Sequence, residues 1–293
     1  MVRFALITNF NINEKLSAAM QVAEKLIATA ECEILITANN KERIARMRLS
    51  RKEFSYLPVD EVYARADIVV VLGGDGTILE SARRAAPHDK PIIGINLGRL
   101  GYMAELDMSE LDLLPRLFSG DYKLEHRSML SVSIIGSTGK SRYSSFALNE
   151  AVISNGSIAR IVDLELYQDN TLMNSYRADG LIIASPTGST AYSMSAGGPI
   201  IDPALACFCV TPICSHFTSS RPVLFSDGAV LNVKNVCKRE KSLYLTLDGK
   251  TNSELYYGDI VRVTRSELTT KLIRLKKQMF YRTLRQKMSE YNN

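Results

Sequence analysis

Apolar residues follow two different patterns along the chain, and the change falls near residue 120. In the first part, short apolar runs alternate with segments whose apolar residues recur every three or four positions. The helical spacing predicts one helix that Asn13 caps and a second one over 78–86, which Pro87 ends. The runs predict strands at 3–8, 32–37, 66–72 and 91–96. Strands that alternate with helices predict an α/β domain with a parallel, Rossmann-like sheet.

From about residue 125 the pattern becomes one strand after another, with turn residues between them. Asp169-Asn170 and Asp248-Gly249 are dipeptides typical of hairpins. This part predicts an antiparallel, sandwich-like all-β domain. Its strands are expected at 129–135, 145–154, 161–167, 171–176, 181–184, 230–233, 243–247 and 259–265.

The last segment returns to helical spacing, with Phe280, Leu284, Met288 and Tyr291 three or four positions apart. We expect a strand at 271–275 and a helix at 279–291 that pack on the first domain, because an apolar stripe needs a partner. Deletion of the residues after Lys276 is therefore expected to destabilise that domain. The predicted domains are 1–122 (α/β), 123–270 (all-β, dinucleotide-binding) and 271–293 (the C-terminal segment).

Composition narrows the class of protein. With 293 residues and 46% hydrophobic residues, the chain is long enough for about two domains with cores. No apolar run approaches the ~20 residues of a membrane span, and we find no secretory signal, so a cytoplasmic protein without a membrane partner is expected. The net charge of +5 suits small anionic ligands. No run of five Lys or Arg indicates a nucleic-acid partner. Five Cys without a CxxC pair indicate reduced thiols.

A glycine-rich turn is the first candidate site. Gly73-Gly74-Asp75-Gly76-Thr77 follows a buried strand and opens a helix, in the crevice where open α/β sheets bind ligands. Gly73, Gly74, Gly76 and Thr77 would let a phosphate approach backbone N–H groups. Asp75 would repel that phosphate unless it orients a hydroxyl, accepts its proton or reaches a Mg²⁺. In the alternative reading, Asp75 only caps the helix.

A polar loop is the second candidate site. After Arg177-Ala178-Asp179-Gly180 and a short strand, the stretch 185–199 is made of hydroxyl-bearing and small residues, with Tyr192 placed to stack on a base. The alternative is a structural Ω-loop whose hydroxyls bond one another. Asn149-Glu150 interrupts an apolar strand, which a bulge or a sheet edge explains equally well.

Other signatures of phosphate or metal binding fail. Neither GxGxxG nor GxxxxGK[ST] occurs, and the similar string at 136–141 has the wrong spacing, so we interpret it as a hairpin loop. The spacing of Cys207, Cys209, Cys214 and His216 fits no usual zinc site. We therefore expect no fixed protein metal site.

Together the motifs resemble the bacterial NAD kinases. The segments 73–77, 94–102, 149–150, 177–192 and 196–199 follow that family's order and approximate spacing, and the similarity covers nearly the whole chain. Diglyceride and sphingosine kinases and phosphofructokinases share only the Gly-Gly-Asp-Gly element. A lipid kinase would need an apolar acceptor slot, and a non-catalytic NAD sensor would need no carboxylate at the phosphate turn.

The resemblance implies a phosphotransferase that phosphorylates the 2′-hydroxyl of the adenosine ribose of NAD. ATP or polyphosphate would be the donor with a divalent metal such as Mg²⁺, and neighbouring subunits of a homotetramer would complete each site. Asp75 would be the general base. Arg99, where the family often has His or Asn, and Lys250, where it often has Gln, depart from the pattern and leave the donor and pyrophosphate contacts open. The dinucleotide contacts would be Gly74, Asp75, Gly76, Tyr102, Asn149, Glu150, Arg177, Asp179, Thr187, Thr190, Ala191, Tyr192 and Ser195.

Overall fold

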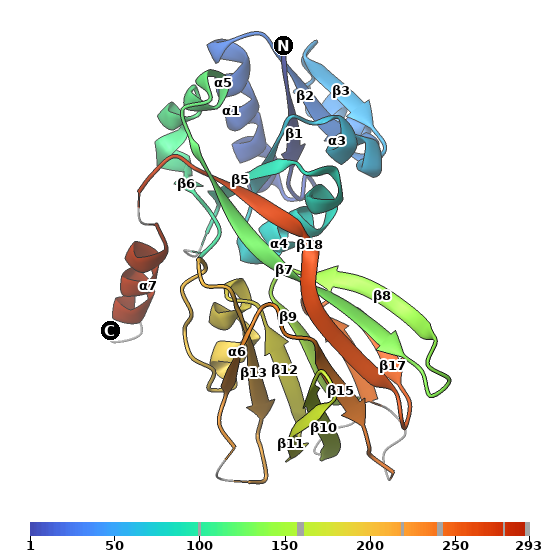
Figure 1. The fold of residues 1–293 in the computed structure, drawn as a ribbon. Helices are drawn as coiled ribbons and strands as arrows, with labels where there is room; N and C mark the ends of the chain where they lie inside the picture. The colour runs from blue at the N-terminus through green and yellow to red at the C-terminus, as the bar shows by residue number, and fades with distance from the viewer. Residues whose placement is uncertain (99–100, 157–160, 218–219, 239–242, 278, 291–293) are drawn as a thin grey trace. The chain divides into compact units, whose positions relative to one another are not determined.

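The computed structural model describes residues 1–98, 101–156, 161–217, 220–238, 243–277 and 279–290 (Figure 1). The chain divides into two compact units. Unit 1 comprises Met1–His126 and Thr270–Asn293, and unit 2 comprises Arg127–Thr269. The C-terminal segment thus belongs to the same unit as the N-terminus. The chain passes from one unit to the other within two long strands, β7 (Lys123–Ile135) and β18 (Ile260–Arg274).

Unit 1 is a parallel α/β unit, as the alternation of strands and helices predicts. The strands pair in the order β3-β2-β1-β4-β5, all parallel, and Lys271 and Leu272 of β18 extend the sheet beside β5. The strands are β1 (Val2–Ile7), β2 (Cys32–Thr37), β3 (Phe54–Leu57), β4 (Ile68–Leu72), β5 (Pro91–Asn96) and β6 (Leu106–Asp107). The helices are α1 (Asn13–Thr29), α2 (Lys41–Arg46), α3 (Val59–Arg65), α4 (Asp75–Ala85), α5 (Arg116–Ser119) and α7 (Met279–Glu290), with short 3₁₀ turns η1 (Ala38–Asn40), η2 (Ala86–His88) and η3 (Met108–Leu113).

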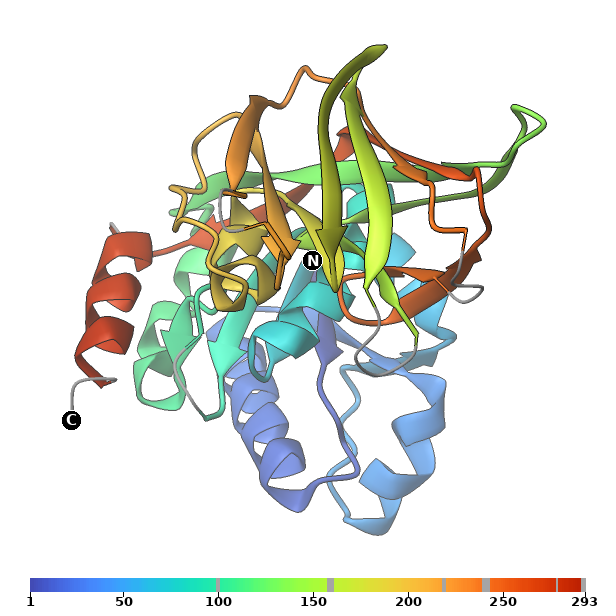
Figure 2. The same cartoon turned by 90° about the horizontal axis from the view of Figure 1, so that it is seen from below.

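Both faces of this sheet are buried, which explains the continuous apolar runs. Phe4 and Leu6 of β1 join the core cluster that α1 supplies with Leu16 and Leu26. Alternate residues such as Ala5 are fully buried as well, and α3 and α4 contact the strands and each other. Figure 2 shows helices on either side of the dark-blue strand β1. One expectation is wrong: α1 begins at Asn13, but Ile12 is its N-cap, and the Asn13 side chain accepts a hydrogen bond from Arg43 Nη2 at 2.7 Å.

Unit 2 consists of antiparallel strands in two layers. One sheet has the order β14-β13-β12-β9-β16-β17; in the other, β11-β10-β15-β18 continues through β7 to β8. Apolar residues from both sheets, such as Ile183 of β12 and Leu164 of β10, form one core cluster. The predicted sandwich is therefore confirmed. The remaining strands are β8 (Ser141–Ala147), β9 (Glu150–Asn155), β10 (Val162–Gln168), β11 (Thr171–Ala178), β12 (Gly180–Ala184), β13 (Cys207–Ile213), β14 (Val223–Ser226), β15 (Leu231–Asn235), β16 (Leu243–Leu247) and β17 (Thr251–Leu255).

The turn dipeptides join hairpins as predicted. β10 pairs with β11 across Asp169-Asn170, and β16 pairs with β17 across Asp248-Gly249. The string at 136–141 joins β7 to β8, which confirms the hairpin loop. Three strands differ from the prediction: 145–154 is divided into β8 and β9 at Leu148 and Asn149, and the separate strands 259–265 and 271–275 are one strand, β18.

Helical turns replace part of the expected loop after β12. Residues Thr187–Thr190 form a 3₁₀ turn, η4, and Tyr192–Ser195 form α6. Both η4 and α6 contact β12. Ile182 and Ala184 of β12 pack with Ile201 in a second apolar cluster. β12 is thus covered on both faces, as its unbroken apolar sequence requires. In the described part of the chain, no helix has the length and hydropathy needed to cross a membrane.

Candidate functional site

The glycine turn lies in unit 1, between the end of β4 and the start of α4. Gly73 bonds through its N–H to Ile95 O at 2.9 Å, and Gly74 is the N-cap of α4. Gly74 and Gly76 are exposed, while Asp75 and Thr77 are half-buried. The first N–H groups of a helix have no acceptor within it, so this turn is suited to binding phosphate oxygens.

Asp75 is clamped by backbone rather than serving as a helix cap. Its Oδ2 accepts the N–H of Tyr102 at 2.9 Å, and its Oδ1 accepts the N–H of Met103 at 3.1 Å. A Cβ on Gly101 would lie 2.2 Å from Asp75 Oδ1, so the segment approaches the carboxylate closely because residue 101 is glycine. Each oxygen keeps a lone pair for a further hydrogen bond. The resemblance implies Tyr102 as a dinucleotide contact, and the structure brings its backbone N–H to Asp75.

A second group of site residues lies in unit 2. Asp248, in the β16–β17 hairpin turn, accepts the backbone N–H groups of Leu148, Asn149 and Glu150 at 2.8–3.1 Å. Asn149 O accepts the N–H of Ser185 at 2.8 Å, and a Cβ on Gly188 would lie 2.2 Å from Asn149 O. The Asn149-Glu150 pair is therefore neither a free edge nor a simple bulge. It lies in backbone contact with the start of the polar loop.

Glu150 is the most perturbed acid of this group. It is 6% exposed, and its Oε2 has no hydrogen-bond partner among the described residues. Burial, reinforced by the nearby Asp248 carboxylate and opposed by a hydrogen bond from the Tyr192 backbone, raises the pKa of Glu150 to about 8. Glu150 is therefore a neutral carboxyl near pH 7, able to donate a hydrogen bond.

The loop after β12 turns some of its hydroxyls inward and others outward. Buried Ser189 bonds Pro186 O at 2.7 Å, and buried Ser193 lies 3.0 Å from Thr211 Oγ1. Thr187, which the resemblance places at the dinucleotide, is 7% exposed and accepts a hydrogen bond from Arg127 Nη1 at 3.2 Å. Thr190 and Ala191 are half-buried, while Tyr192 and Ser195 are exposed. Tyr192 and Ser195 line a cavity of about 620 Å³ with Pro212–Ser215.

Arg177 and Asp179 lie apart from the Asn149–Glu150 group within the chain. Gly180 pairs with Ser154, whereas Ala184 pairs with Glu150, so the length of β12 separates the two sets of residues. Four residues of strand correspond to about 13 Å. Asp179 and Arg177 are both exposed, and Arg177 faces Asp163 at 4.0 Å. They lie instead beside the wall of the cavity that Tyr192 and Ser195 line, since the N–H of Asp179 donates to Ile213 O at 2.9 Å.

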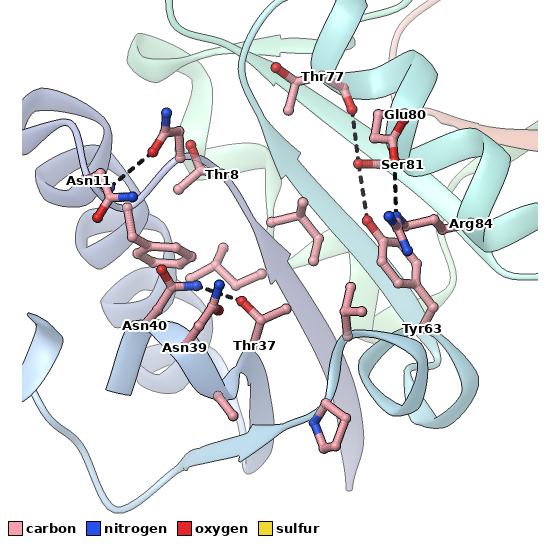
Figure 3. A pocket seen from close by; sticks show the side chains of 17 residues that line it. Thr8, Asn11, Thr37, Asn39, Asn40, Tyr63, Thr77, Glu80, Ser81 and Arg84 are labelled. Atoms are coloured by element: carbon pink, nitrogen blue, oxygen red, sulfur yellow. Dashed lines mark hydrogen bonds and ion pairs between the residues drawn. The ribbon is translucent and has the colours of Figure 1, made fainter. Parts of the chain in front are cut away.

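A cavity of about 640 Å³ opens in unit 1 at the carboxyl ends of the strands (Figure 3). It is lined by the residues after β1 and β2, such as Asn9 and Asn39, by Tyr63 of α3, and by Thr77 and Arg84 of α4. Thr8 Oγ1 bonds Leu72 O at 2.9 Å across β1 and β4. From β1 the sheet grows to one side through β2 and β3 and to the other through β4 and β5, so the strand order reverses between β1 and β4, which is where open α/β sheets bind ligands. Of the sequence motifs, the glycine turn reaches this cavity through Thr77.

No metal cluster is found among the described residues: no three His, Cys, Asp or Glu side chains converge on one point. Cys207 and Cys209 lie in β13, and all five cysteines are free thiols. Of the two departures from the family pattern, Lys250 is exposed beside the Asp248-Gly249 turn. Arg99 lies outside the described residues.

Sequence reasoning missed the residues that support the site. The turn dipeptide at Asp248 predicts only a hairpin, and no sequence motif includes Met103 or Arg127. A turn Asp that also binds backbone N–H groups has no local signature. Arg127 is 2% exposed, and a single Arg at the start of an apolar strand is the one signal in the sequence that indicates such a buried partner.

Comparisons with known proteins match almost the whole chain. Family models for the ATP-NAD kinase N-terminal and C-terminal domains match residues 4–122 and 148–275. An NAD kinase of Symbiobacterium thermophilum is 38% identical over 290 residues, covering 99% of each chain. An NAD kinase of Geotalea daltonii is 41% identical over 232 residues, covering 78% of this chain and 80% of the relative.

Solved structures share the fold. A yeast NADH kinase complexed with NADH has a TM-score of 0.89 at 23% identity, over 97% of this chain and 86% of that one. An NAD kinase from Archaeoglobus fulgidus in complex with ATP has a TM-score of 0.69 at 24% identity, over 97% and 96% of the two chains. Since both family models match, and relatives more than 35% identical span the chain, it belongs to the NAD kinase family, a family of phosphotransferases.

Proposed function

We propose that this chain transfers the terminal phosphoryl group of a nucleoside triphosphate to the 2′-hydroxyl of the adenosine ribose of NAD, giving NADP. The observation that carries the proposal is the carboxylate of Asp75 at the start of α4, which the backbone N–H groups of Tyr102 and Met103 orient. As the new O–P bond forms and the bond to the leaving diphosphate breaks, Asp75 takes the proton of the hydroxyl. Phosphoryl transfer needs little more than a base, in-line placement and stabilised charge.

The divalent metal would come with the donor. The described residues offer no three-ligand cluster, but Asp75 is a carboxylate at a phosphate turn, and Mg²⁺ is commonly held by substrate phosphates with one or two carboxylates. When bound, Mg²⁺ neutralises charge on the phosphates. The N–H groups of the first turn of α4 would hold the transferred phosphoryl oxygens.

The residues of unit 2 would hold the dinucleotide. The neutral carboxyl of Glu150 can donate a hydrogen bond where a carboxylate could only accept one. Exposed Tyr192 offers a ring for stacking, and Ser195 offers a hydroxyl beside the same cavity of about 620 Å³. Half-buried Thr190 carries another hydroxyl in the same loop. Arg177 and Asp179, one strand length away, would serve the site of a neighbouring subunit in a homotetramer. The reaction would take place in the cytoplasm, where free thiols are stable.

The cavity between β1 and β4 would hold the nucleoside of the donor. Its volume of about 640 Å³ falls in the range of small-molecule sites, and its wall includes Thr77 of the phosphate turn. A linear polyphosphate has no group that would fill such a cavity. The geometry therefore favours a nucleoside triphosphate over polyphosphate.

A substitution in that cavity tests the donor. Val59, 37% exposed, lines it, so Val59→Arg should fill it and raise KM for ATP at least about tenfold while KM for NAD stays unchanged. Val223, 39% exposed in β14 of unit 2, is the matched control, and Val223→Arg should change neither constant. An unchanged KM for ATP in Val59→Arg would contradict the proposal that the nucleoside binds in this cavity.

The activity itself is tested by incubating the purified protein with NAD and MgATP and measuring NADP with an NADP-specific dehydrogenase. Parallel incubations replace ATP with polyphosphate, and NAD with diacylglycerol vesicles. NADP formation with ATP is expected. A folded protein that makes no NADP with either donor but phosphorylates diacylglycerol would establish the lipid-kinase alternative.

A further inference from the structure

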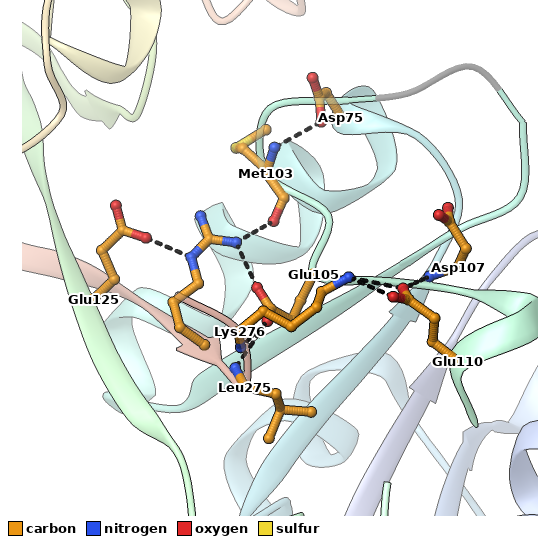
Figure 4. Close-up of polar contacts among 9 residues, drawn as sticks. Asp75, Met103, Glu105, Asp107, Glu110, Glu125, Leu275 and Lys276 are labelled. Atoms are coloured by element: carbon orange, nitrogen blue, oxygen red, sulfur yellow. Dashed lines mark hydrogen bonds and ion pairs between the residues drawn. The ribbon is translucent and has the colours of Figure 1, made fainter. Parts of the chain in front are cut away.

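A buried ion cluster joins the end of β18 to the segment after β5 (Figure 4). The side chain of Glu105 is 0% exposed and that of Arg274 is 9% exposed, with Arg274 Nη1 3.2 Å from Glu105 Oε2. Glu105 Oε1 accepts the N–H groups of Leu275 at 2.8 Å and Lys276 at 2.7 Å. Arg274 Nε also bonds the carboxylate of Glu125. Both carboxylate oxygens of Glu105 and the Nε and Nη1 atoms of Arg274 are thus hydrogen-bonded.

The cluster reaches Asp75 through a single residue. Arg274 Nη1 donates to Met103 O at 3.3 Å, and the N–H of Met103 donates to Asp75 Oδ1 at 3.1 Å. The same short segment is tied to β5 by the bond from Glu105 N to Gly94 O at 2.8 Å. Residues 101 and 103–106 are buried, so packed neighbours rather than solvent surround this segment.

The energetics favour orientation over stability as the role of this cluster. Taking two charges out of water offsets most of their attraction, and well-packed apolar residues commonly stabilise such a position as well or better. Burial raises the pKa of Glu105, against the opposing effects of Arg274 and the two N–H groups. An Arg fork, however, directs several hydrogen bonds in fixed directions, which apolar residues do not.

We propose that Arg274 and Glu105 are positioning residues that fix the backbone of residues 101–105 and thereby the direction of the Asp75 carboxylate. The inference rests on the proposed function, in which Asp75 removes the proton. Neither residue touches substrate. Their effect reaches the reaction only through the N–H groups of Tyr102 and Met103.

A double-mutant cycle tests this route. Arg274→Lys keeps the charge beside Glu105 but loses the fork that also holds Met103 O. In the full-length protein, kcat should fall about 10- to 100-fold with KM for NAD within about twofold, as expected for a misplaced catalytic group. In the Asp75→Asn background the same substitution should change single-turnover rates less than about twofold, because the group it positions is gone.

Two further measurements test the same role independently. Glu105→Gln keeps the shape of the side chain and removes its charge, and it should lower kcat as Arg274→Lys does. The amide proton signals of Tyr102 and Met103, which report the bonds to Asp75, should move in Arg274→Lys. This NMR measurement requires no turnover, so it tests the positioning role even if the wild type makes no NADP and the proposed function fails.

Arg3→Lys is the matched control. Arg3 also binds a carboxylate with two nitrogens, to Asp67 at 2.7 and 3.1 Å, but at the opposite ends of β1 and β4 from Asp75. Its kcat should stay within about twofold of the wild type and the two amide signals should not move. The proposal is overturned if Arg274→Lys and Glu105→Gln leave kcat unchanged, if kcat falls equally with and without Asp75, or if the amide signals stay in place.

Discussion

At the scale of single residues, the hydrogen bonds of Asp75 distinguish the proposed catalytic role from the role of a helix cap. Its carboxylate bonds the N–H groups of residues 102 and 103 and makes no cap bond to its own helix, so the helix-cap alternative is contradicted. The same geometry means that Asn is not a silent replacement. An amide offers one oxygen to two N–H donors, so one of them loses its partner.

Asp75→Asn should therefore lower kcat by ~10²–10⁴ through loss of the base, with a smaller added effect of misorientation. The dissociation constant for NAD, measured by calorimetry, should change much less. Asp67→Asn is the control, because Asp67 also accepts a backbone N–H, from Arg3 at 2.9 Å. A turnover of Asp75→Asn within about fivefold of the wild type at saturating substrates would rule out Asp75 as the base.

Glu150 should make stability depend on pH. Its pKa rises from 4.5 to about 8 on folding, so the folded state keeps a proton that the unfolded chain releases. The stability associated with this proton is complete below about pH 4.5 and is lost as the pH rises toward 8, at up to about 1.4 kcal/mol per pH unit.

Glu150→Gln removes this titration. Its free energy of unfolding, from urea titrations between pH 5 and 8.5, should exceed that of the wild type by an amount that grows with pH and levels off above about pH 8. A difference that stays constant with pH would contradict the buried neutral carboxyl.

At the scale of elements, the strands of unit 1 were predictable because β1, β2, β4 and β5 are buried on both faces and read as continuous apolar runs. The short β3 and α3 have no such run, and we did not predict them. β13 was not predictable because Cys207, Cys209 and Pro212 interrupt the pattern typical of a strand. The break between β8 and β9 at Asn149 was not predictable because it depends on Asp248, which lies 99 residues further along the chain and accepts the N–H of Asn149.

The site was predictable to the same extent. The glycine turn and the polar loop are local and therefore visible in sequence. The two hydrogen bonds to the Asp75 carboxylate come from residues that lie 27 and 28 positions further along the chain, and the Arg274–Met103 hydrogen bond spans 171 positions. Contacts at such separations follow from the fold and leave no spacing pattern.

Helix α7 tests the expectation that the C-terminus stabilises unit 1. Ile273 and Leu275, before Lys276, belong to the first core cluster, whereas in α7 Tyr281 and Met288 are exposed. Truncation after Lys276 removes buried Thr283 and two contacts with the Tyr102 ring, from Phe280 with centroids 6.1 Å apart and from Lys287 Nζ at 4.4 Å, and should cost about 1–2 kcal/mol.

Truncation after Thr270 is the comparison. It removes buried Leu272, Ile273 and Leu275 together with Arg274, and should cost more than about 5 kcal/mol. Both are measured by thermal unfolding. Equal losses of stability in the two truncated chains would assign the stabilisation to α7 after all.

At the scale of the whole molecule, the homotetramer proposed above predicts complementation between subunits, because the length of β12 separates Arg177 and Asp179 from Glu150. Asp75→Asn and Asp179→Ala should each be nearly inactive alone. Co-expressed and purified as mixed oligomers, they should regain about a quarter of wild-type activity, since random assembly leaves that share of sites with both residues intact. Mixed oligomers without activity would place Asp179 in the same subunit's site or outside it.

The bond from Arg274 to Met103 also has a consequence for synthesis of the protein. A ribosome that has made residue 103 must add 171 more before Arg274 exists, which takes roughly 10–30 s at bacterial rates. During that time the nascent chain carries its glycine turn and Asp75 without the arginine that holds the adjacent backbone. Nascent or prematurely terminated chains should therefore be poor catalysts, so that activity arises only once translation is nearly complete.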